Sequence, residues 1–163
     1  MRIIFFILSL NLSLVYADTG FRYIKGKVLV NDKVAIKATK LIEGDVVKVG
    51  KKSLAIIYMD KKSLLKVNEN SEMIIEKLDP DQKLSSITLN SGSLFSKILK
   101  KSKTKKSIFN VRARSAIMGV RGTEFFVSYG KNEESQNVWM CVDEGMVEVA
   151  TKGSSAKTNV KAG

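Results

Sequence analysis

Short apolar runs separated by turn residues recur along the whole chain. Turn pairs such as Asn31-Asp32, Glu43-Gly44 and Asn90-Ser91 follow one another roughly every eight to twelve residues, and the runs between them are rich in Val, Ile, Leu and Phe. Apolar and polar side chains alternate within many runs, as in strands that bury one face. The pattern predicts an all-β fold, with stacked short antiparallel strands forming a twisted β-sandwich or β-solenoid-like domain.

The alternation also places individual strands. It is clearest at residues 27–30, 34–37, 87–89 and 146–149. Residues 54–59 are apolar throughout and predict a central strand, and residues 108–111 and 125–127 predict core strands. Residues 151–163 are poor in large side chains, so we expect a last edge strand or a frayed end. Helical periodicity is weak, and its best candidate, residues 96–103, also fits a strand leaving the sheet.

A short internal repeat strengthens the prediction of regular β-layers. The tetrapeptide KKSL occurs at residues 51–54 and again at 61–64, each time after a turn residue and before an apolar strand. One strand plus one corner accounts for the ten-residue spacing between the two copies. The repeat is compatible with a coiled β-solenoid and equally with a hairpin.

The first 17 residues have the pattern of a secretory signal peptide. Arg2 precedes the apolar run at residues 3–8, and Val15 and Ala17 supply small side chains where a signal peptidase cleaves. We therefore expect a signal peptide over residues 1–17 and one domain over residues 18–163. No integral membrane span is expected after signal removal, so the mature protein is predicted to be periplasmic or exported.

Positive charge is concentrated in the middle of the chain. The formal net charge is +12, and residues 82–123 carry ten Lys or Arg and no Asp or Glu. A basic strip of this kind could contact an acidic partner protein, an anionic envelope polymer or lipid headgroups, although such runs are often only solvated faces. The lysines assigned to partner binding are Lys97, Lys100, Lys101, Lys103, Lys105 and Lys106.

The residue types in this chain give little support for a catalytic function. The chain has no histidine, which removes the commonest general base and zinc ligand. Its one cysteine, Cys141, lies in the apolar run VWMCV, so we expect a buried packing residue rather than a nucleophile. Closely spaced acids such as Asp79 and Asp81 fall at predicted corners, where such residues usually serve solubility or turn hydrogen bonds. We expect no enzyme activity, cofactor or metal. Few aromatic residues lie near the lysines, and Phe95 and Phe109 are expected to point inward, so nucleic-acid binding is not expected either.

The heptapeptide GVRGTEF at residues 119–125 holds an arginine between two glycines. Backbone N–H groups beside glycines can bind an anion, but the stretch lies between two predicted core strands with no helix after it. Positive φ or close packing at a tight corner explains the glycines better. We therefore predict that Arg121 is a structural tether to Glu144, Asp143 or loop carbonyls, with ligand binding as the alternative. The predicted structural motif comprises Gly119, Arg121, Gly122, Thr123, Phe125, Glu144 and Gly145.

Three groups of motifs, in order, resemble the FecR domain family of bacterial envelope proteins. The first joins GKV at 26–28, EGDVV at 43–47 and GKKSLA at 50–55; the second runs from FNVR at 109–112 into GVRGTEF; the third is VDEGMVEV at 142–149. Together they cover roughly residues 21–163. Two departures are Ala113-Arg114, where the family has Thr-Pro, and Asp60 to Ser63, where it has Asp-Gly-Ser.

The resemblance implies an all-β envelope domain that binds another protein. The best-known members relay a signal from an outer-membrane receptor to a cytoplasmic sigma factor. This chain shows neither a cytoplasmic anti-sigma segment nor an added receptor-binding subdomain, so it resembles the stand-alone exported form. The implied role is a protein-interaction and signalling module whose partner is an envelope or outer-membrane protein, and the alternative is binding of anionic envelope polymer or lipid headgroups through the basic strip.

Overall fold

The computed structural model describes residues 19–59, 63–78, 84–99, 108–130 and 137–163. Within these ranges every regular element is a strand, which confirms the all-β fold. The strands are β1 (Gly20–Lys25), β2 (Val28–Val30), β3 (Lys33–Val34), β4 (Val46–Val49), β5 (Leu54–Met59), β6 (Ser63–Val67), β7 (Ser71–Lys77), β8 (Leu84–Ile98), β9 (Ile108–Ala113), β10 (Ala116–Val120), β11 (Thr123–Tyr129), β12 (Val138–Glu144), β13 (Met146–Thr151) and β14 (Lys157–Lys161).

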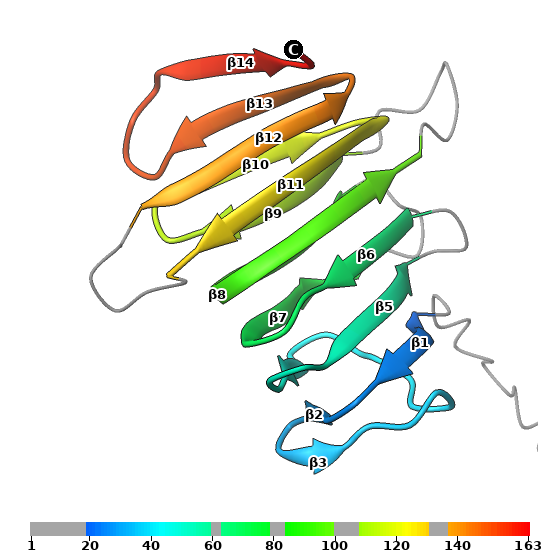
Figure 1. Ribbon diagram of the computed structural model, residues 1–163. Helices are drawn as coiled ribbons and strands as arrows, with labels where there is room; N and C mark the ends of the chain where they lie inside the picture. The colour runs from blue at the N-terminus through cyan, green and yellow to red at the C-terminus, as the bar shows by residue number, and fades with distance from the viewer. Residues whose placement is uncertain (1–18, 60–62, 79–83, 100–107, 131–136) are drawn as a thin grey trace, which may run out of the picture.

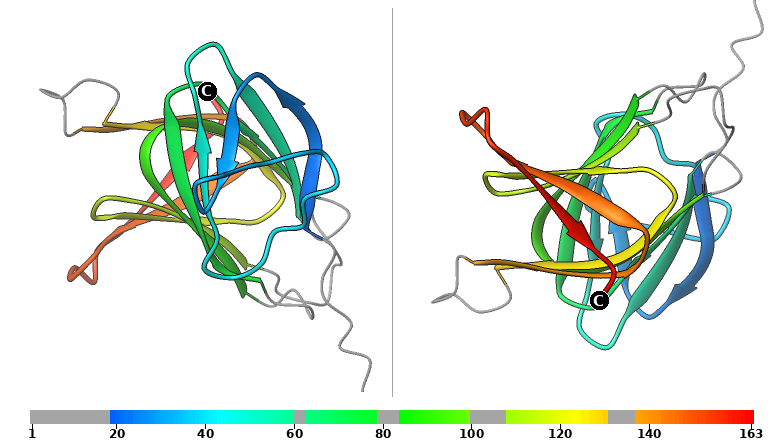
Figure 2. Two further views of the ribbon diagram at one scale, coloured as in Figure 1. Left: turned by 90° about the horizontal axis from the view of Figure 1, so that it is seen from below. Right: turned by 90° about the horizontal axis from the view of Figure 1, so that it is seen from above.

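All of these strands belong to one sheet that folds over into two layers (Figure 1). The front layer has the order β1, β5, β6, β8, β11, β12. The back layer has the order β3, β2, β4, β7, β8, β9, β10, β13, β14. The end-on views in Figure 2 show the layers facing each other across a shared interior. The fold is therefore a sandwich whose two layers share β8.

β8 belongs to both layers because it bends in the middle. Its first half buries Ile87 and Leu89 and pairs with β7 and β9, whereas its second half buries Leu94 and Ile98 and pairs with β6 and β11. The core-facing hydrophobic positions of β8 thus change from odd-numbered residues before the bend to even-numbered residues after it. The register against β7 skips one residue at the same place, as at a β-bulge. The predicted turn at residues 90–92 is therefore a bend within a continuous strand.

Gly92 makes this bend possible. Its φ is +89°, a region that favours glycine, and a Cβ atom here would lie 2.2 Å from the Ser71 hydroxyl oxygen and 2.5 Å from the Ser71 Cα. The N–H of the next residue, Ser93, donates to that hydroxyl at 3.0 Å. The same arrangement occurs where the chain passes from β1 to β2. There Gly26 has a φ of +74° and lies against Ser53, whose hydroxyl accepts the Lys27 N–H at 2.8 Å.

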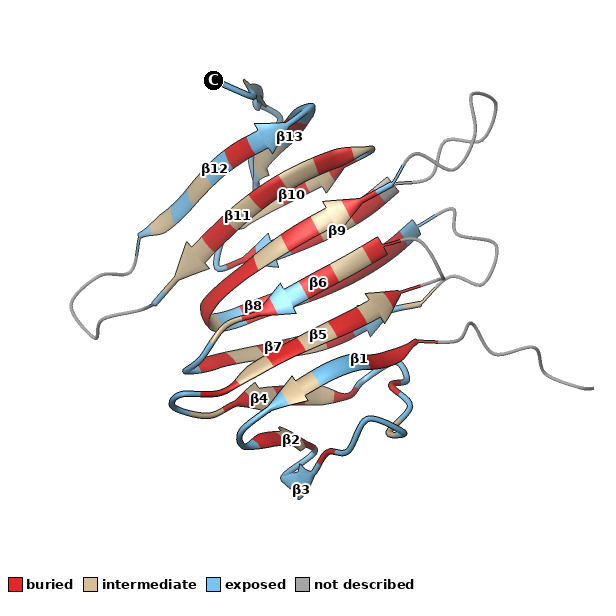
Figure 3. Cartoon of the chain, turned by 45° about the vertical axis from the view of Figure 1, so that its right-hand side comes forward, coloured by how far each residue is buried: buried red, intermediate tan, exposed pale blue. Residues whose placement is uncertain are grey.

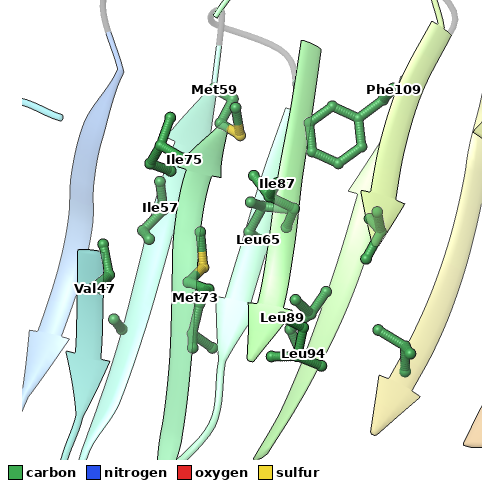
Figure 4. Packing of buried hydrophobic residues seen from close by; sticks show 14 of the residues in the cluster. Val47, Ile57, Met59, Leu65, Met73, Ile75, Ile87, Leu89, Leu94 and Phe109 are labelled. Carbon is green, nitrogen blue, oxygen red and sulfur yellow. The ribbon is translucent and has the colours of Figure 1, made fainter. Parts of the chain in front are cut away.

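The hydrophobic core fills the space between the layers. Buried and less buried residues alternate along β5, β6 and β11, as the banding in Figure 3 shows. Side chains from both layers meet in the interior, among them Ile57, Leu65, Met73 and Ile87, each with no exposed surface (Figure 4). Burying a side chain of this size stabilises the fold by about 1.5–3 kcal/mol. The core therefore holds the two layers together without any disulfide.

Several predicted elements differ in detail from the observed ones. The pair β8 and β9 is parallel, whereas all other pairs are antiparallel as expected. β3 comprises residues 33–34 and overlaps the strand predicted at 34–37 only at Val34. The two KKSL copies lead into β5 and β6, which pair antiparallel, so the repeat marks a hairpin. The C-terminal segment forms an edge strand, β14, as predicted. Part of the ambiguous segment 96–103 is the end of β8, and its residues 100–103 lie outside the described residues.

Candidate functional site

The GVRGTEF stretch carries the chain from the back layer to the front layer. Gly119 lies within β10, paired with Asn110 and Glu148, and has no positive φ. The expectation of a corner at Gly119 was therefore wrong. The turn follows at Arg121 and Gly122, where Gly122 has a φ of +63°, and β11 begins at Thr123. Phe125 is fully buried in the core, as predicted.

Gly145 carries the chain back again, from β12 to β13, and packs against the first crossing. Its φ is +87°, and a Cβ atom here would lie 2.8 Å from the Gly122 carbonyl oxygen and 2.8 Å from the Thr123 Cγ2. The two halves of the predicted motif are thus in direct contact. As at Gly26 and Gly92, a glycine with positive φ packs against a hydroxyl-bearing residue where the chain changes layers. The three crossings differ in the hydrogen bonding of that hydroxyl. The Thr123 hydroxyl is buried and has no hydrogen-bond partner among the described residues.

Arg121 and Glu144 lie at this junction, and both are exposed. The predicted tether from Arg121 therefore concerns a surface arginine rather than a buried charge. Which group Arg121 holds stays a prediction. Exposure lowers the expected effect of its removal, because solvent screens surface ion pairs.

Lys97 faces the same junction from the end of β8. It pairs with Glu124 across the β8 and β11 register, and the two side chains form a salt bridge in which 45% of the lysine and 18% of the glutamate remains exposed. The hydrogen bond and charge of Glu124 raise the pKa of Lys97 above its ordinary value of 10.5, and the charges of Glu144 and Asp143 add to this rise. Of the six lysines assigned to partner binding, Lys97 therefore already has an internal partner. The other five, at 100, 101, 103, 105 and 106, lie outside the described residues.

A cavity of about 220 Å³ opens beside this pair. Its lining residues are Ile98, Leu99, Gly122, Thr123, Glu124 and Glu144. Sites for small molecules are usually larger, about 300–1,000 Å³. Within the described ranges no group of three or more His, Cys, Asp or Glu side chains could hold a metal ion. The cavity therefore offers little support for a small-molecule or metal site.

The outer face of the front layer carries a row of large side chains that crosses all six strands. The pairing registers place Tyr23, Ile56, Lys66, Phe95, Phe126 and Cys141 side by side, from β1 to β12. Trp139 lies on the same face of β12 and is 69% exposed, and Tyr23 is 47% exposed. We call this surface the front outer face. It places aromatic side chains, which are enriched at protein interfaces, within reach of a partner.

Two sequence expectations are corrected on this face. Cys141 is exposed rather than buried, because β12 turns its odd-numbered residues outward and buries Val142. Phe95 is only half-buried and points outward, whereas Phe109 is buried as expected. The aromatic row itself was not predicted. The apolar run at 54–59 gave one signal, since it supplies large side chains to both faces of β5.

Comparisons with known proteins agree with this architecture. The sequence profile of the FecR protein family matches residues 45–148, more than half of the chain, leaving the first motif at 26–28 outside. Two crystal structures of a candidate anti-sigma factor from Parabacteroides distasonis ATCC 8503, at 2.50 and 1.65 Å resolution, each superpose with a TM-score of 0.58 and 18% identity. Each match covers 72% of this chain and 51% of the solved chain, so this chain matches about half of that protein's length.

Among curated proteins, none matches this chain. No helix long and apolar enough to cross a membrane occurs in the described part of the chain.

Proposed function

Since this chain belongs to the FecR protein family, we propose that it is a non-catalytic exported envelope protein whose domain acts as a protein-interaction and signalling module. Residues 1–17 serve as its signal peptide, and residues 18–163 form the single domain that works outside the cytoplasm. Its partner is an envelope or outer-membrane protein. The front outer face is the observation that carries this proposal.

Three features of the front outer face support a protein partner. Its aromatic side chains contribute large contact areas, and Tyr and Trp are over-represented among residues that dominate binding energy. The exposed Lys66 lies in the middle of the row, between Ile56 and Phe95, where it can pair with a partner carboxylate. The strands beneath are held by a fully buried core, so the face is rigid and loses little conformational freedom on binding. We therefore expect a partner with an apolar surface that bears acidic groups.

A protein partner can be tested by affinity capture from envelope fractions. The wild-type chain should recover one stoichiometric envelope or outer-membrane protein. A double variant of the front outer face, Phe95→Ser with Phe126→Ser, should lose it, whereas Arg112→Gln on the outer face of the back layer should retain it. Equal capture by all three proteins would remove the front outer face from the proposal.

Binding of anionic envelope polymer or lipid headgroups is the second candidate. The observation that favours it is the concentration of positive charge at residues 82–123, which carry ten Lys or Arg and no Asp or Glu. Such binding through dispersed lysines should be lost at about 0.3 M salt, where the Debye length falls well below 8 Å, while a packed protein interface should persist. Replacing the six assigned lysines by glutamine should abolish polymer binding. If every detected partner stays bound to that variant, the strip is a solvated face.

A further inference from the structure

The two layers end in four edge strands, and three of them carry protection against pairing with another chain. β3 has only two residues. β14 begins and ends with lysine, at Lys157 and Lys161. β1 is covered at its start, because the Leu41 N–H donates to the Thr19 carbonyl at 2.9 Å and Gly20 bridges to Lys40. Short length, lysine and covering segments are the usual means of blocking edge-to-edge association.

The fourth edge, β12, has none of these features. It is seven residues long, contains neither lysine nor proline, and pairs along one side with β11. Within the described part of the chain, no backbone hydrogen bond reaches the other side of residues 138–142. The Ala162 N–H donates to the Gly145 carbonyl at 3.1 Å, so the end of the chain lies beside the residue that follows β12, and β14 makes a few contacts with β12. On this side, residues 138–142 therefore present backbone donors and acceptors that no described part of the chain pairs with.

The side chains of β12 suit pairing with a second copy of the same strand. Residues 138–142 carry no charge, so two copies meet there without repulsion despite the basic character of the protein. Val138, Met140 and Val142 face the core, and Trp139 and Cys141 face outward. Antiparallel pairing centred on Met140 places Val138 opposite Val142 of the second copy and Trp139 opposite its Cys141. Apolar residues then meet apolar residues on both faces.

Other registers are less favourable. Centring the pair on Cys141 would place Trp139 opposite Asp143 and Val138 opposite Glu144. A shift by a single residue would turn the core-facing residues of one copy toward the outer face of the other. In the Met140 register, Asn137 instead lies opposite Asp143 at each end, where an amide can donate to a carboxylate.

We propose that β12 is a self-association edge, which pairs antiparallel with β12 of a second copy around Met140. The two front layers then form one continuous sheet related by a two-fold axis, and the front outer face doubles in width. This interface is isologous, so it closes at the dimer. It involves one strand from each copy, which corresponds to the weak end of specific protein interfaces. Self-association does not depend on the proposed envelope partner, and its test needs none.

Sedimentation velocity of the full chain under reducing conditions tests the association directly. From micromolar to millimolar concentration the sedimentation coefficient should rise from the monomer value and level off at the dimer value. The double variant Trp139→Lys with Cys141→Lys should stay monomeric, because it sets lysines opposite each other twice across the interface. Asn159→Lys on the protected β14 edge is the matched control and should dimerise like wild type. A wild-type monomer throughout, growth beyond the dimer, or equal loss in the control would overturn the proposal.

Disulfide trapping tests the register of the β12 pair. It also keeps the proposal testable in the event that the double lysine variant does not fold. In Trp139→Cys, the new thiol lies directly opposite the native Cys141 of the second copy, so copper phenanthroline should trap covalent dimers. In wild type, the two Cys141 residues lie diagonally across the pair, beyond ordinary disulfide reach. Trapping should be at least about tenfold faster in the variant. Equal rates, or trapping in wild type alone, would contradict pairing around Met140.

Discussion

The two outer faces of the sandwich use their side chains in opposite ways. The front outer face carries Tyr23, Phe95, Phe126 and Trp139, with aromatic surface open to solvent. Among the described residues, the outer face of the back layer has no aromatic side chain: outside the second half of β8, which belongs to the front layer, the back-layer strands contain one aromatic residue, Phe109, and it is buried inward.

Charge shows the same contrast. On the back layer three pairs of polar side chains contact each other, Lys48 with Asp32, Lys157 with Glu148 and Asn90 with Glu72, each at 2.8 Å. Lys66, at the centre of the front outer face, is exposed and faces apolar neighbours on both sides. The outer face of the back layer therefore pairs part of its charge within the monomer, whereas the front outer face leaves aromatic surface and a lysine available for a partner.

Two neighbouring phenylalanines give the largest expected difference between core and face. Phe125→Ala should lower the free energy of unfolding by about 3–5 kcal/mol, because it leaves a cavity in the core. Phe126→Ala, one residue later on the front outer face, should cost about 1 kcal/mol, since its ring is only half-buried. Urea unfolding followed by circular dichroism measures both. Similar losses would mean that the front outer face belongs to the core.

The bend that separates the two layers should be nearly as sensitive. Gly92→Ala forces an unfavourable positive φ and a clash with Ser71, for a combined cost of roughly 2–5 kcal/mol. Gly153→Ala is the matched control, with a φ of +85° and no atom within 4 Å of the added Cβ. It should cost only about 1 kcal/mol. Equal costs for the two variants would show that the contact with Ser71 is unimportant.

The crossing at Gly145 should have a smaller effect. Gly145→Ala sets a methyl group against the Gly122 carbonyl and Thr123, and should cost about 1–3 kcal/mol. Arg121→Met, at the exposed side of the same junction, should cost no more than about 1 kcal/mol. Thermal unfolding compares them. A larger loss for Arg121→Met would restore the arginine as the principal tether.

The ion pair on the front outer face should have the smallest effect, visible as a pH dependence. Glu124 raises the pKa of Lys97 in the folded protein, so the pair stabilises the fold below pH 10.5 and this stabilisation disappears as pH rises through the folded pKa. Glu124→Gln should move the pKa of Lys97 back toward 10.5, as followed by NMR of the lysine side chain. An unchanged pKa would show that the pair does not form in solution.

The sequence predicted the layers well because apolar alternation directly records which face of a strand is buried. Ile87 and Leu89, or Phe125 and Val127, could be assigned to the core on this basis. The parallel pairing of β8 with β9 could not be foreseen, because strand order depends on contacts far apart in the chain. The bend at Gly92 was mistaken for a turn, since a glycine with positive φ serves both purposes.

The candidate surfaces were harder to predict. Cys141 was assigned to the core from its apolar neighbours, but an edge strand with one layer behind it leaves half of its apolar residues outside. The partner of Lys97 was also missed, because Glu124 lies 27 positions away and becomes its neighbour only through the register of β8 with β11. The glycines of the family motifs, Gly26, Gly122 and Gly145, mark the places where the chain crosses between the layers.

Site-specific photo-crosslinking in intact cells tests most directly whether the two outer faces differ in function. A photoreactive benzoylphenylalanine replaces Lys66 at the centre of the front outer face, or Glu148 on the exposed outer face of the back layer. One defined crosslinked envelope partner is expected from position 66 and none from position 148. Crosslinks of equal yield from both positions, or from position 148 alone, would contradict this expectation.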